Sequence, residues 1–468
     1  MTSLNRLSAR ELTAGYASGS LSPVEATTAA LDAIASFDCQ VNAFVLVTAE
    51  AALEQAKESE TRWRAGQALG PADGVPTSIK DIFLTRDLPT LRGTTLIDPT
   101  GPWSEDAPAV ARLRSAGAVF LGKTTTPEFA WKGVTDSIRH GATGNPWDAG
   151  LTSGGSSGGS ATAVGLGMGA WSVGTDGGGS VRIPAAFTGT VALKPTYGLV
   201  PMFPASPFGT LAHAGPITRT VTDAAALLDV IVGFDERDWS ALPTPNRSFL
   251  DDLAAGVRGL RIAFSPNLGF VDNDPEVERL VREAAGVLAE LGAHVEEVDP
   301  GFTDPVDAFH VLWFAGAAKV TEAYGPDAPN RVDPGLRRAV ELGREMTASD
   351  FLDATAVRMD LGLRMGRFHR TYDLLLTPTM PITAFPTGMD APLGWPSRDW
   401  TSWTPYTYPF NMTQQPALSV PCGLTSAGLP AALQIVGPRH SDRTVLRAGR
   451  AYEQATSWNT LVPTLAAS

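Results

Sequence analysis

Cysteine and histidine are scarce in this sequence. Its 468 residues include two cysteines, Cys39 and Cys422, which excludes a disulfide framework and a cysteine-rich metal site. The six histidines stand singly, without the H-E-x-x-H or H-x-H spacing of zinc sites. We therefore expect neither a catalytic metal nor any other cofactor.

Positive charge and long apolar runs are also lacking. The formal net charge is −13, and no stretch concentrates the lysines and arginines that phosphate binding requires. No apolar run is long enough to span a bilayer, and the first residues, MTSLNRLSARELTAG, contain no apolar segment of signal-peptide length. The sequence predicts a cytoplasmic protein with no nucleic-acid or membrane partner.

No linker, charge block or internal repeat divides the chain. Its composition, 43% hydrophobic and 18% charged, is that of a globular protein with a sizeable core. Although the length allows about three domains, we expect a single domain over residues 1–468. Within it we distinguish a helical segment at 1–65, a central region at 74–235 that carries the motifs described below, and an aromatic- and Pro-rich loop at 380–410.

The apolar periodicity changes along the chain. Residues 9–16 and 22–36 carry apolar positions at helical spacing, and Ser22 and Pro23 fit an N-cap and a first turn. From about residue 74, short apolar runs between Gly and Pro predict buried strands that alternate with helices. The strands are expected at 118–121, 191–193, 260–264, 374–376, 418–420 and 433–436, and the helices at 107–116, 222–232, 275–291 and 441–455. This alternation predicts an α/β architecture with helices covering a largely buried sheet.

Glycine and serine are concentrated in two clusters, SGGSSGGS at 153–160 and TDGGGS at 175–180. Backbone with so few side chains can bring N–H groups and hydroxyls close to a reacting atom. Acyl transfer needs a nucleophile, a base and donors for the developing oxyanion. Serine supplies the first, and no histidine lies near either cluster. Lysine is the remaining candidate base.

Lys80 is that candidate, because it lies in the largely apolar segment GVPTSIKDIF. Burial lowers a lysine pKa from its usual value of roughly 10.4. The alternative is a solvated Lys80 paired with Asp81. The serine clusters favour the buried base.

Two further motif matches need separate consideration. Residues 117–124, GAVFLGKT, fit the phosphate-loop pattern, but 118–121 is itself a predicted strand and not the required polar loop, so we reject nucleotide binding. Residues 154–158, GGSSG, fit the nucleophile elbow of α/β-hydrolases. An esterase with Ser156 as nucleophile and His440 as its histidine stays open as an alternative.

Several segments resemble, in order and spacing, the amidase signature family of Ser-Ser-Lys amidohydrolases. They are GVPTSIKD, GKTTTPEFA, NPWD, SGGSSGGSATAVGLGMGAWSVGTDGGGSVRIPAAFTGTVALKPTYG, GPITRTVTDAAALLD, YDLLLTPTMP and PALSVPCGLTSAGLPAALQIVG. The resemblance covers nearly the whole chain. It implies the amidase signature fold, an α/β structure in which helices cover both faces of a large central mixed sheet.

The resemblance also implies roles for individual residues. Ser180 matches the nucleophile, Lys80 matches the base, and Ser156 matches the serine between them, which follows a cis peptide bond in the family. The amides expected to form the oxyanion hole are those of Gly177, Gly178, Gly179 and Ser180, and the residues expected to support the site are Asp176, Arg182 and Ser157.

The implied activity is hydrolysis of amide C–N bonds through an acyl-Ser180 intermediate. The aromatic loop suggests a hydrophobic pocket, and hence small, apolar or aryl amides, with carbamates and esters as further substrates. The residues expected to line the pocket are Gln414, Trp395, Trp400, Trp403 and Tyr406, with Phe203, Phe208, Phe309, Trp313 and Phe314 as further candidates. Gln414 stands where the family's N-x-x-G-x-P-A pattern has glycine, and we expect it to change the shape or polarity of the pocket.

Two other functions remain possible on the same fold. One is the A subunit of a tRNA-dependent amidotransferase, which works with a partner and has an acidic residue shortly before the Asn411 position, whereas residues 400–410 hold no carboxylate here. The other is a non-catalytic binding protein, which the intact Lys80, Ser156 and Ser180 disfavour. We therefore expect a stand-alone monomer or homodimer that acts on a small-molecule amide.

Overall fold

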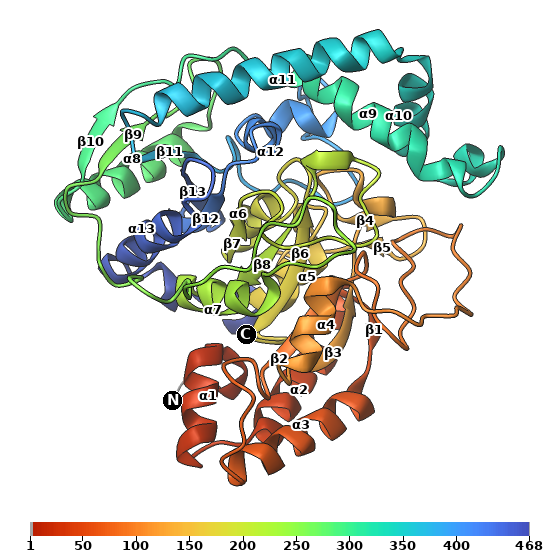
Figure 1. Ribbon diagram of the computed structural model, residues 1–468, viewed down its shortest axis with the longest axis vertical. Helices are drawn as coiled ribbons and strands as arrows, with labels where there is room; N and C mark the ends of the chain where they lie inside the picture. The colour runs from red at the N-terminus through yellow and green to blue at the C-terminus, as the bar shows by residue number, and fades with distance from the viewer. Residues whose placement is uncertain (1–2, 468) are drawn as a thin grey trace.

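A continuous mixed β-sheet runs through the protein (Figure 1). The computed structural model describes residues 3–467. The strands of the sheet are β1 (Phe44–Val47), β2 (Pro76–Lys80), β3 (Val119–Thr124), β6 (Trp171–Asp176), β7 (Val191–Lys194), β8 (His213–Thr218), β9 (Arg261–Phe264), β10 (His294–Glu297), β11 (Leu374–Pro378), β12 (Ala417–Leu424) and β13 (Pro430–Val436), while β4 (Asp136–Ser137) and β5 (Gly141–Ala142) pair separately. The order across the sheet is β1-β3-β2-β6-β8-β7-β12-β13-β11-β9-β10. Strands β2, β3 and β6 run parallel, as do β9, β10 and β11, and the remaining neighbours are antiparallel.

Helices connect most of the strands. The α-helices are α1 (Ala9–Ser18), α2 (Pro23–Val41), α3 (Ala49–Arg64), α4 (Pro108–Ser115), α5 (Gly158–Gly165), α6 (Arg182–Thr188), α7 (Val221–Ile231), α8 (Pro275–Glu290), α9 (Val306–Glu322), α10 (Pro334–Glu345), α11 (Ala348–Phe368), α12 (Tyr408–Met412), α13 (Asp442–Ala455) and α14 (Thr464–Ala467). The 3-10 helices are η1 (Leu4–Arg6), η2 (Glu128–Ala130), η3 (Gly209–Leu211), η4 (Ala328–Arg331), η5 (Trp400–Trp403) and η6 (Trp458–Thr460).

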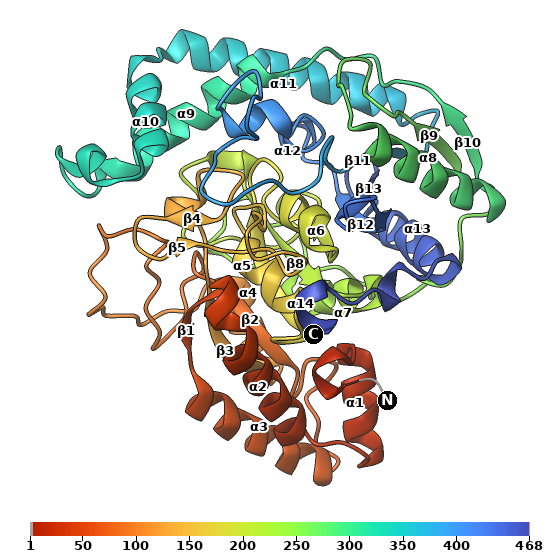
Figure 2. The same ribbon diagram turned by 180° about the vertical axis from the view of Figure 1, so that it is seen from behind.

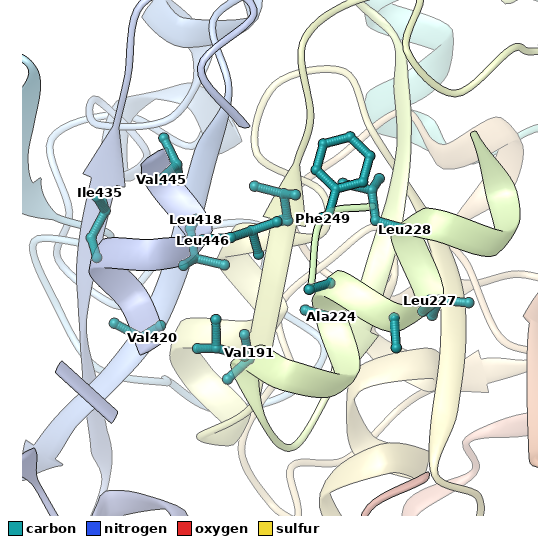
Figure 3. Close-up of a cluster of buried hydrophobic side chains, with 14 of the residues drawn as sticks. Val191, Ala224, Leu227, Leu228, Phe249, Leu418, Val420, Ile435, Val445 and Leu446 are labelled. Carbon is teal, nitrogen blue, oxygen red and sulfur yellow. The ribbon is translucent and has the colours of Figure 1, made fainter. Parts of the chain in front are cut away.

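Both faces of the sheet are covered. Along β7, Val191 and Leu193 belong to one buried cluster and Ala192 to another, because successive strand residues point to opposite faces. Figure 3 shows the first cluster, where side chains of α7 and α13 pack against β7, β12 and β13. Ala161 of α5 and Ala185 of α6 pack on the other face. The predicted α/β fold, a large mixed sheet with helices on both faces, is confirmed.

Further helices extend the molecule beyond the sheet at both ends. Helices α1, α2 and α3 lie beside β1, β3 and β2 at one end of the molecule, and α9, α10 and α11 lie together at the other end of the molecule (Figures 1 and 2). Helix α9 packs against α10, α11 and α12. Trp313 of α9 lies against Gly177, so α9 borders the turn that follows β6.

The local sequence signals agree with the observed elements. Ser22 accepts a hydrogen bond from Glu25 N–H at 3.1 Å, and the Glu25 carboxylate accepts one from Ser22 N–H at 2.8 Å, which is a capping box at the start of α2. Pro23 occupies the first turn, as predicted. The strands and helices predicted beyond residue 74 all coincide with observed elements, with shifted boundaries.

The segment 380–410 is largely irregular, as predicted, yet it holds η5 and the first residues of α12. Several of its aromatic side chains, including Trp403 and Tyr406, are buried in the core. No helix among residues 3–467 combines the length and apolar character needed to cross a membrane. The single domain over 1–468 stays a prediction, and residues 1, 2 and 468 lie outside the described part of the chain.

Candidate active site

The sheet brings Lys80, Ser156 and Ser180 together. Lys80 is the last residue of β2, and the parallel neighbour β6 ends at Asp176, so both strands finish at the same edge of the sheet. Ser156 lies in the turn before α5, and Ser180 lies in the turn between β6 and α6. Ser156 and Ser180 line one cavity. The three predicted catalytic positions therefore meet at one site.

Lys80 is fully buried, and its side-chain nitrogen is surrounded by hydroxyl groups. Lys80 Nζ lies 2.7 Å from Ser156 Oγ, 2.9 Å from Ser157 Oγ and 2.8 Å from Thr175 Oγ1. Burial lowers the pKa of Lys80 well below its usual value, and the charge of Asp176 opposes part of this effect. The neutral amine is therefore favoured far more strongly than in a solvated lysine.

The alternative pairing of Lys80 with Asp81 is not observed. The Asp81 carboxylate lies 3.4 Å from Lys123 Nζ instead, and Lys123 also donates to Phe83 O at 3.0 Å. Lys123 is buried within β3. Burial lowers its pKa to about 8, against the opposing effect of the Asp81 carboxylate. The GKT stretch is thus part of the buried strand β3 and not of a polar loop, as the sequence predicted.

Ser157 holds Lys80 and the end of β6 together. Its hydroxyl donates to Thr175 O at 3.1 Å and accepts from Thr175 N–H at 3.3 Å. Because its only proton is engaged in this way, Ser157 acts as an acceptor toward Lys80. Ser156 follows a cis peptide bond after Gly155, as the resemblance implied, and its hydroxyl lies between Lys80 and the cavity.

The three glycines before Ser180 pass through a space too narrow for side chains. A Cβ on Gly177 would lie 2.8 Å from Trp313 Cζ3, and one on Gly178 would lie 2.7 Å from Trp400 Cη2. Gly179 has a φ of +130°, a conformation that L side chains rarely adopt. The turn can therefore follow this path only without side chains.

The amides of this turn are not equivalent. The N–H groups of Gly177, Gly178 and Ser180 have no acceptor within residues 3–467. In contrast, Gly179 N–H donates to Asp176 Oδ1 at 2.8 Å. The expectation that Gly179 belongs to the oxyanion hole therefore needs correction, because a buried carboxylate already occupies its N–H. Three amides remain free to bind an oxyanion.

Asp176 and Arg182, two of the residues expected to support the site, form a buried ion pair. Arg182 Nη2 lies 2.9 Å from Asp176 Oδ1, and Arg182 Nε donates to Asp176 Oδ2 at 3.0 Å. Burial alone would raise the pKa of Asp176, but the charge and hydrogen bonds of Arg182 hold it well below its usual range. Arg182 also donates to Asn411 Oδ1 at 2.7 Å and to Gln434 Oε1 at 2.8 Å. This network anchors the turn that carries Ser180 to α12 and β13.

The cavity beside Ser180 is mostly apolar. It is bounded by the end of β2, by η2, by the segment 202–208 and by α9. The residues that supply most of its wall are Ile82, Phe83, Phe129, Met202, Phe203, Phe208 and Trp313. Phe203, Phe208 and Trp313 were among the further apolar candidates, whereas Phe309 and Phe314 do not line it.

The five residues chosen for the pocket do not line this cavity. Trp403 donates to Asp390 O at 2.9 Å, and Tyr406 OH donates to Asn273 Oδ1 at 2.7 Å, so both are fixed within the core. Trp395 is only partly buried and packs against the same apolar cluster. Gln414 donates to Thr210 O at 3.4 Å and lies in a separate hollow beside α11.

Trp400, the fifth of these residues, lies behind the glycine turn. Its ring is in edge contact with the rings of Phe309 and Trp313, and it closes the space next to Gly178. The aromatic segment thus supports the turn from behind and leaves the wall of the cavity to other residues. Sequence composition showed an aromatic cluster but could not show which side of it faces the site.

The structure argues against the nucleophile-elbow alternative, because His440 does not lie at the cavity. His440 is exposed. Its backbone N–H donates to Thr196 Oγ1 at 2.9 Å. Ser156 instead has Lys80 as its neighbour. Among the described residues, no three His, Cys, Asp or Glu side chains are placed to share a metal ion.

Sequence reasoning missed several residues of this site, among them the wall residues Ile82, Phe83, Phe129 and Met202. Two polar residues were missed as well. Thr175 supplies the third hydroxyl around Lys80, and its place inside TDGGGS could have suggested it. Arg92 lines the cavity, but it lies in no motif, and no sequence signal could have placed it near Ser180.

Comparisons with known proteins show the family to which the chain is similar. The family model described as Amidase matches residues 25–446. The acylamidase of Rhodococcus erythropolis is 37% identical over 97% of this chain and 96% of its own length. The A subunit of the glutamyl-tRNA(Gln) amidotransferase of Chloroflexus aggregans is 37% identical over 100% of both chains.

Solved structures show the same similarity. A bacterial aryl acylamidase of the amidase signature family has a TM-score of 0.91 and 31% identity, covering 97% of each chain. The 6-aminohexanoate cyclic dimer hydrolase, in complex with its substrate, has a TM-score of 0.89 and 28% identity, covering 98% of this chain and 99% of that one.

Proposed function

The chain belongs to the amidase signature family, whose enzymes act on amide C–N bonds, and from this premise we propose that it hydrolyses small, apolar amides, aryl amides among them, through an acyl-Ser180 intermediate. One observation carries the proposal. The buried Lys80 Nζ lies 2.7 Å from Ser156 Oγ, and Ser156 shares an apolar cavity with Ser180.

In the proposed first step, protons move from Ser180 toward Lys80. Ser156 gives its hydroxyl proton to the neutral Lys80 amine and takes the proton of Ser180. The Ser180 oxygen then attacks the substrate carbonyl carbon. Lys80 can serve as this base because burial favours its neutral form.

The tetrahedral intermediate carries a negatively charged oxygen that needs donors. The free amides of Gly177, Gly178 and Ser180 are the proposed oxyanion hole, and the indole rings behind the glycines keep these amides in place. Loss of one such donor typically lowers kcat about 100- to 1000-fold. Hydrogen bonds that strengthen as the charge develops accelerate the chemical step.

The intermediate then collapses and the C–N bond breaks. Ser156 gives its proton to the leaving nitrogen and regains one from the protonated Lys80, so the amine leaves as a neutral molecule. Water attacks the acyl-Ser180 ester through the same relay and releases the carboxylic acid. Carbamates and esters have the same type of reacting carbonyl and fit the same scheme.

The apolar wall of the cavity supports the substrate class. Phe83, Phe129 and Trp313 offer flat apolar surfaces near Ser180, which suit an aryl or alkyl group. Two of the similar proteins are named acylamidase and aryl acylamidase, and these names support the same substrate class.

The amidating component of a tRNA-dependent amidotransferase is the second candidate. The equal identity of 37% to the A subunit of a glutamyl-tRNA(Gln) amidotransferase favours it. The largely apolar cavity favours the stand-alone hydrolase, because free glutamine offers little apolar surface to bury. Hydrolysis of glutamine without hydrolysis of any anilide would favour the amidotransferase.

The experiment joins covalent labelling to a substrate panel. A fluorophosphonate probe, mapped by mass spectrometry, is expected to label Ser180. Purified protein is assayed with 4-nitroanilides, primary amides, glutamine, carbamates and esters. We expect Ser180→Ala to lower kcat/KM by about 1000-fold or more for every hydrolysed substrate. Ser160→Ala is the matched control, because Ser160 is a buried serine outside the cavity.

Two results would contradict the proposal. Labelling at Ser156 together with an active Ser180→Ala variant would favour the nucleophile-elbow esterase. Absence of both label and turnover across the panel would favour a non-catalytic binding protein.

A further inference from the structure

Arg92 is the single charged residue among those described around the cavity at Ser180. The other lining residues are apolar, small or hydroxylic. The Arg92 side chain is only partly buried, so its guanidinium can stay accessible beside the apolar wall without a partner of opposite charge.

No such partner is present for Arg92. Within residues 3–467 its guanidinium makes no ion pair and no side-chain hydrogen bond. The acidic residue next to it in space is Asp81, whose backbone oxygen accepts Arg92 N–H at 3.1 Å. The Asp81 carboxylate, however, is directed to Lys123 Nζ at 3.4 Å and to Leu91 N–H. The positive charge of Arg92 is therefore left for a ligand.

The backbone at Arg92 is held from both sides. Its backbone N–H donates to Asp81 O at 3.1 Å, and its carbonyl oxygen accepts a hydrogen bond from Phe129 N–H at 2.8 Å. Arg92 has a φ of +52°, in the left-handed region that non-glycine residues rarely occupy. The position of Arg92 in the wall is thus fixed by contacts of the main chain, and its side chain takes no part in them.

The charge of Arg92 acts on the pKa of a tyrosine beside the cavity. Phe129 lines the cavity, and its ring centroid is 5.6 Å from that of Tyr324. Burial raises the pKa of the Tyr324 phenol, and the positive charge of Arg92 opposes this rise. The guanidinium therefore lies within electrostatic range of the Tyr324 phenol.

We propose that Arg92 binds a carboxylate of the substrate, so that the preferred substrates are amides whose apolar acyl or amine portion ends in a carboxylate. The planar guanidinium can donate two parallel hydrogen bonds to a carboxylate, and such charge-assisted pairs are roughly twice as strong as hydrogen bonds between neutral groups. The apolar wall would contact the part of the substrate between the amide and the carboxylate. This inference rests on the proposed amide hydrolysis.

The test uses matched pairs of substrates that differ in one charge. Glutaryl-4-nitroanilide is compared with its methyl ester for the acyl side, and 4-acetamidobenzoate with its methyl ester for the amine side. For at least one pair we expect wild-type kcat/KM to be about 10-fold or more higher for the acid. Arg92→Met is expected to lower kcat/KM for that acid about 10- to 100-fold, the usual range for a charged hydrogen bond, and to affect its ester far less.

Two further variants keep the test informative if Arg92→Met folds poorly. Arg92→Lys preserves the charge and should retain part of the preference for the acid. Arg86→Met removes an exposed arginine of the same segment outside the cavity and should leave both members of each pair unchanged. The inference is overturned if the wild type prefers the uncharged member of both pairs, or if Arg92→Met lowers acid and ester equally.

Calorimetry separates this inference from the proposed function. Binding of the same pairs is measured with Ser180→Ala and with the double variant that adds Arg92→Met. Preferential binding of the acid that depends on Arg92, without turnover by the wild type, would overturn the proposed hydrolysis and support the carboxylate site. Turnover of amides without any dependence on Arg92 would support the proposed hydrolysis and overturn the carboxylate site.

Discussion

Lys80 has three hydroxyl neighbours and no carboxylate in direct contact, an arrangement that determines its protonation. Asp176, whose charge acts on Lys80, is itself paired with Arg182. Burial therefore dominates and lowers the pKa of Lys80 well below its usual value. When the amine is neutral it needs one hydrogen-bond donor, and Ser156 at 2.7 Å is suited to supply it. Protonation of Lys80 would remove the acceptor on which the proposed relay depends.

This arrangement predicts the pH dependence of catalysis. The active form holds neutral Lys80, so kcat/KM should fall as the pH decreases through the lowered pKa of Lys80 and should stay high above it. Lys80→Met should lower kcat/KM by about 100- to 10,000-fold and remove this acid limb. The measurement is kcat/KM for a 4-nitroanilide across the pH range.

The exposed Lys57, replaced by Met, is the control for this prediction. An acid limb of unchanged position in the Lys80→Met variant would show that another group titrates, and Lys80 would then not be the base.

At the scale of elements, the turn between β6 and α6 is held by a single carboxylate. Asp176 accepts hydrogen bonds from Gly179 N–H at 2.8 Å and from Val181 N–H at 3.2 Å. The same carboxylate receives two hydrogen bonds from Arg182 at the start of α6. Strand end, glycine turn and helix start are thus joined through one buried side chain. The amides proposed to hold the oxyanion lie within this unit.

Asp176→Asn tests this unit. Asparagine keeps the shape of the side chain but leaves the buried Arg182 without its counter-charge, so we expect the free energy of unfolding to fall by about 3–5 kcal/mol. We also expect a lower kcat at temperatures where the variant is folded, because the turn is less firmly held. Urea unfolding and kcat measurements check the two effects.

Asp148→Asn is the matched control, because Asp148 also accepts a backbone N–H, from Gly150, but is exposed. The prediction is wrong if both variants unfold at the same urea concentration.

At the scale of the whole molecule, one lysine joins three distant segments. Lys132 Nζ lies 2.6 Å from Asp136, 3.2 Å from Asp333 at the start of α10, and 2.8 Å from Asp390 in the aromatic segment. Lys132 is buried with 3% of its side chain exposed. Burial alone would lower its pKa, but the three carboxylates raise it above the usual value. Next to it, Trp131 O accepts the Nε1–H of Trp313, the residue of α9 that reaches the cavity.

Lys132→Met removes the cation from this cluster, and we expect the free energy of unfolding to fall by about 3–5 kcal/mol at neutral pH. Without the lysine the carboxylates repel one another, so their pKa values in the folded state rise above the unfolded value of about 3.9. The folded variant then binds more protons than the unfolded chain, and its stability increases as the pH falls.

The loss of stability should therefore be smaller at about pH 5 than at about pH 7. Urea unfolding at both pH values checks this, with the exposed Lys319 replaced by Met as control. A deficit of equal size at both pH values would show that carboxylate repulsion is not its cause.

The elements of the fold were accessible from the sequence because they depend on local signals. Short apolar runs predicted the central strands, and Ser22, Pro23 and Glu25 encode the start of α2 through contacts between near neighbours. The positions of Lys80, Ser156 and Ser180 could be identified because their motifs are local too. The bare glycines before Ser180 also signal a close backbone approach without any structure.

The sequence by itself thus determined the fold class, the family and the three positions at which catalysis is proposed. Only the tertiary structure decided what surrounds them, since contacts between residues far apart leave no periodic signal. It directed Trp400 to the back of the glycine turn, engaged Gly179 N–H with Asp176, and brought Arg92 into the cavity wall. These contacts depend on how β2, β6 and α9 pack together, and packing is a property of the whole chain.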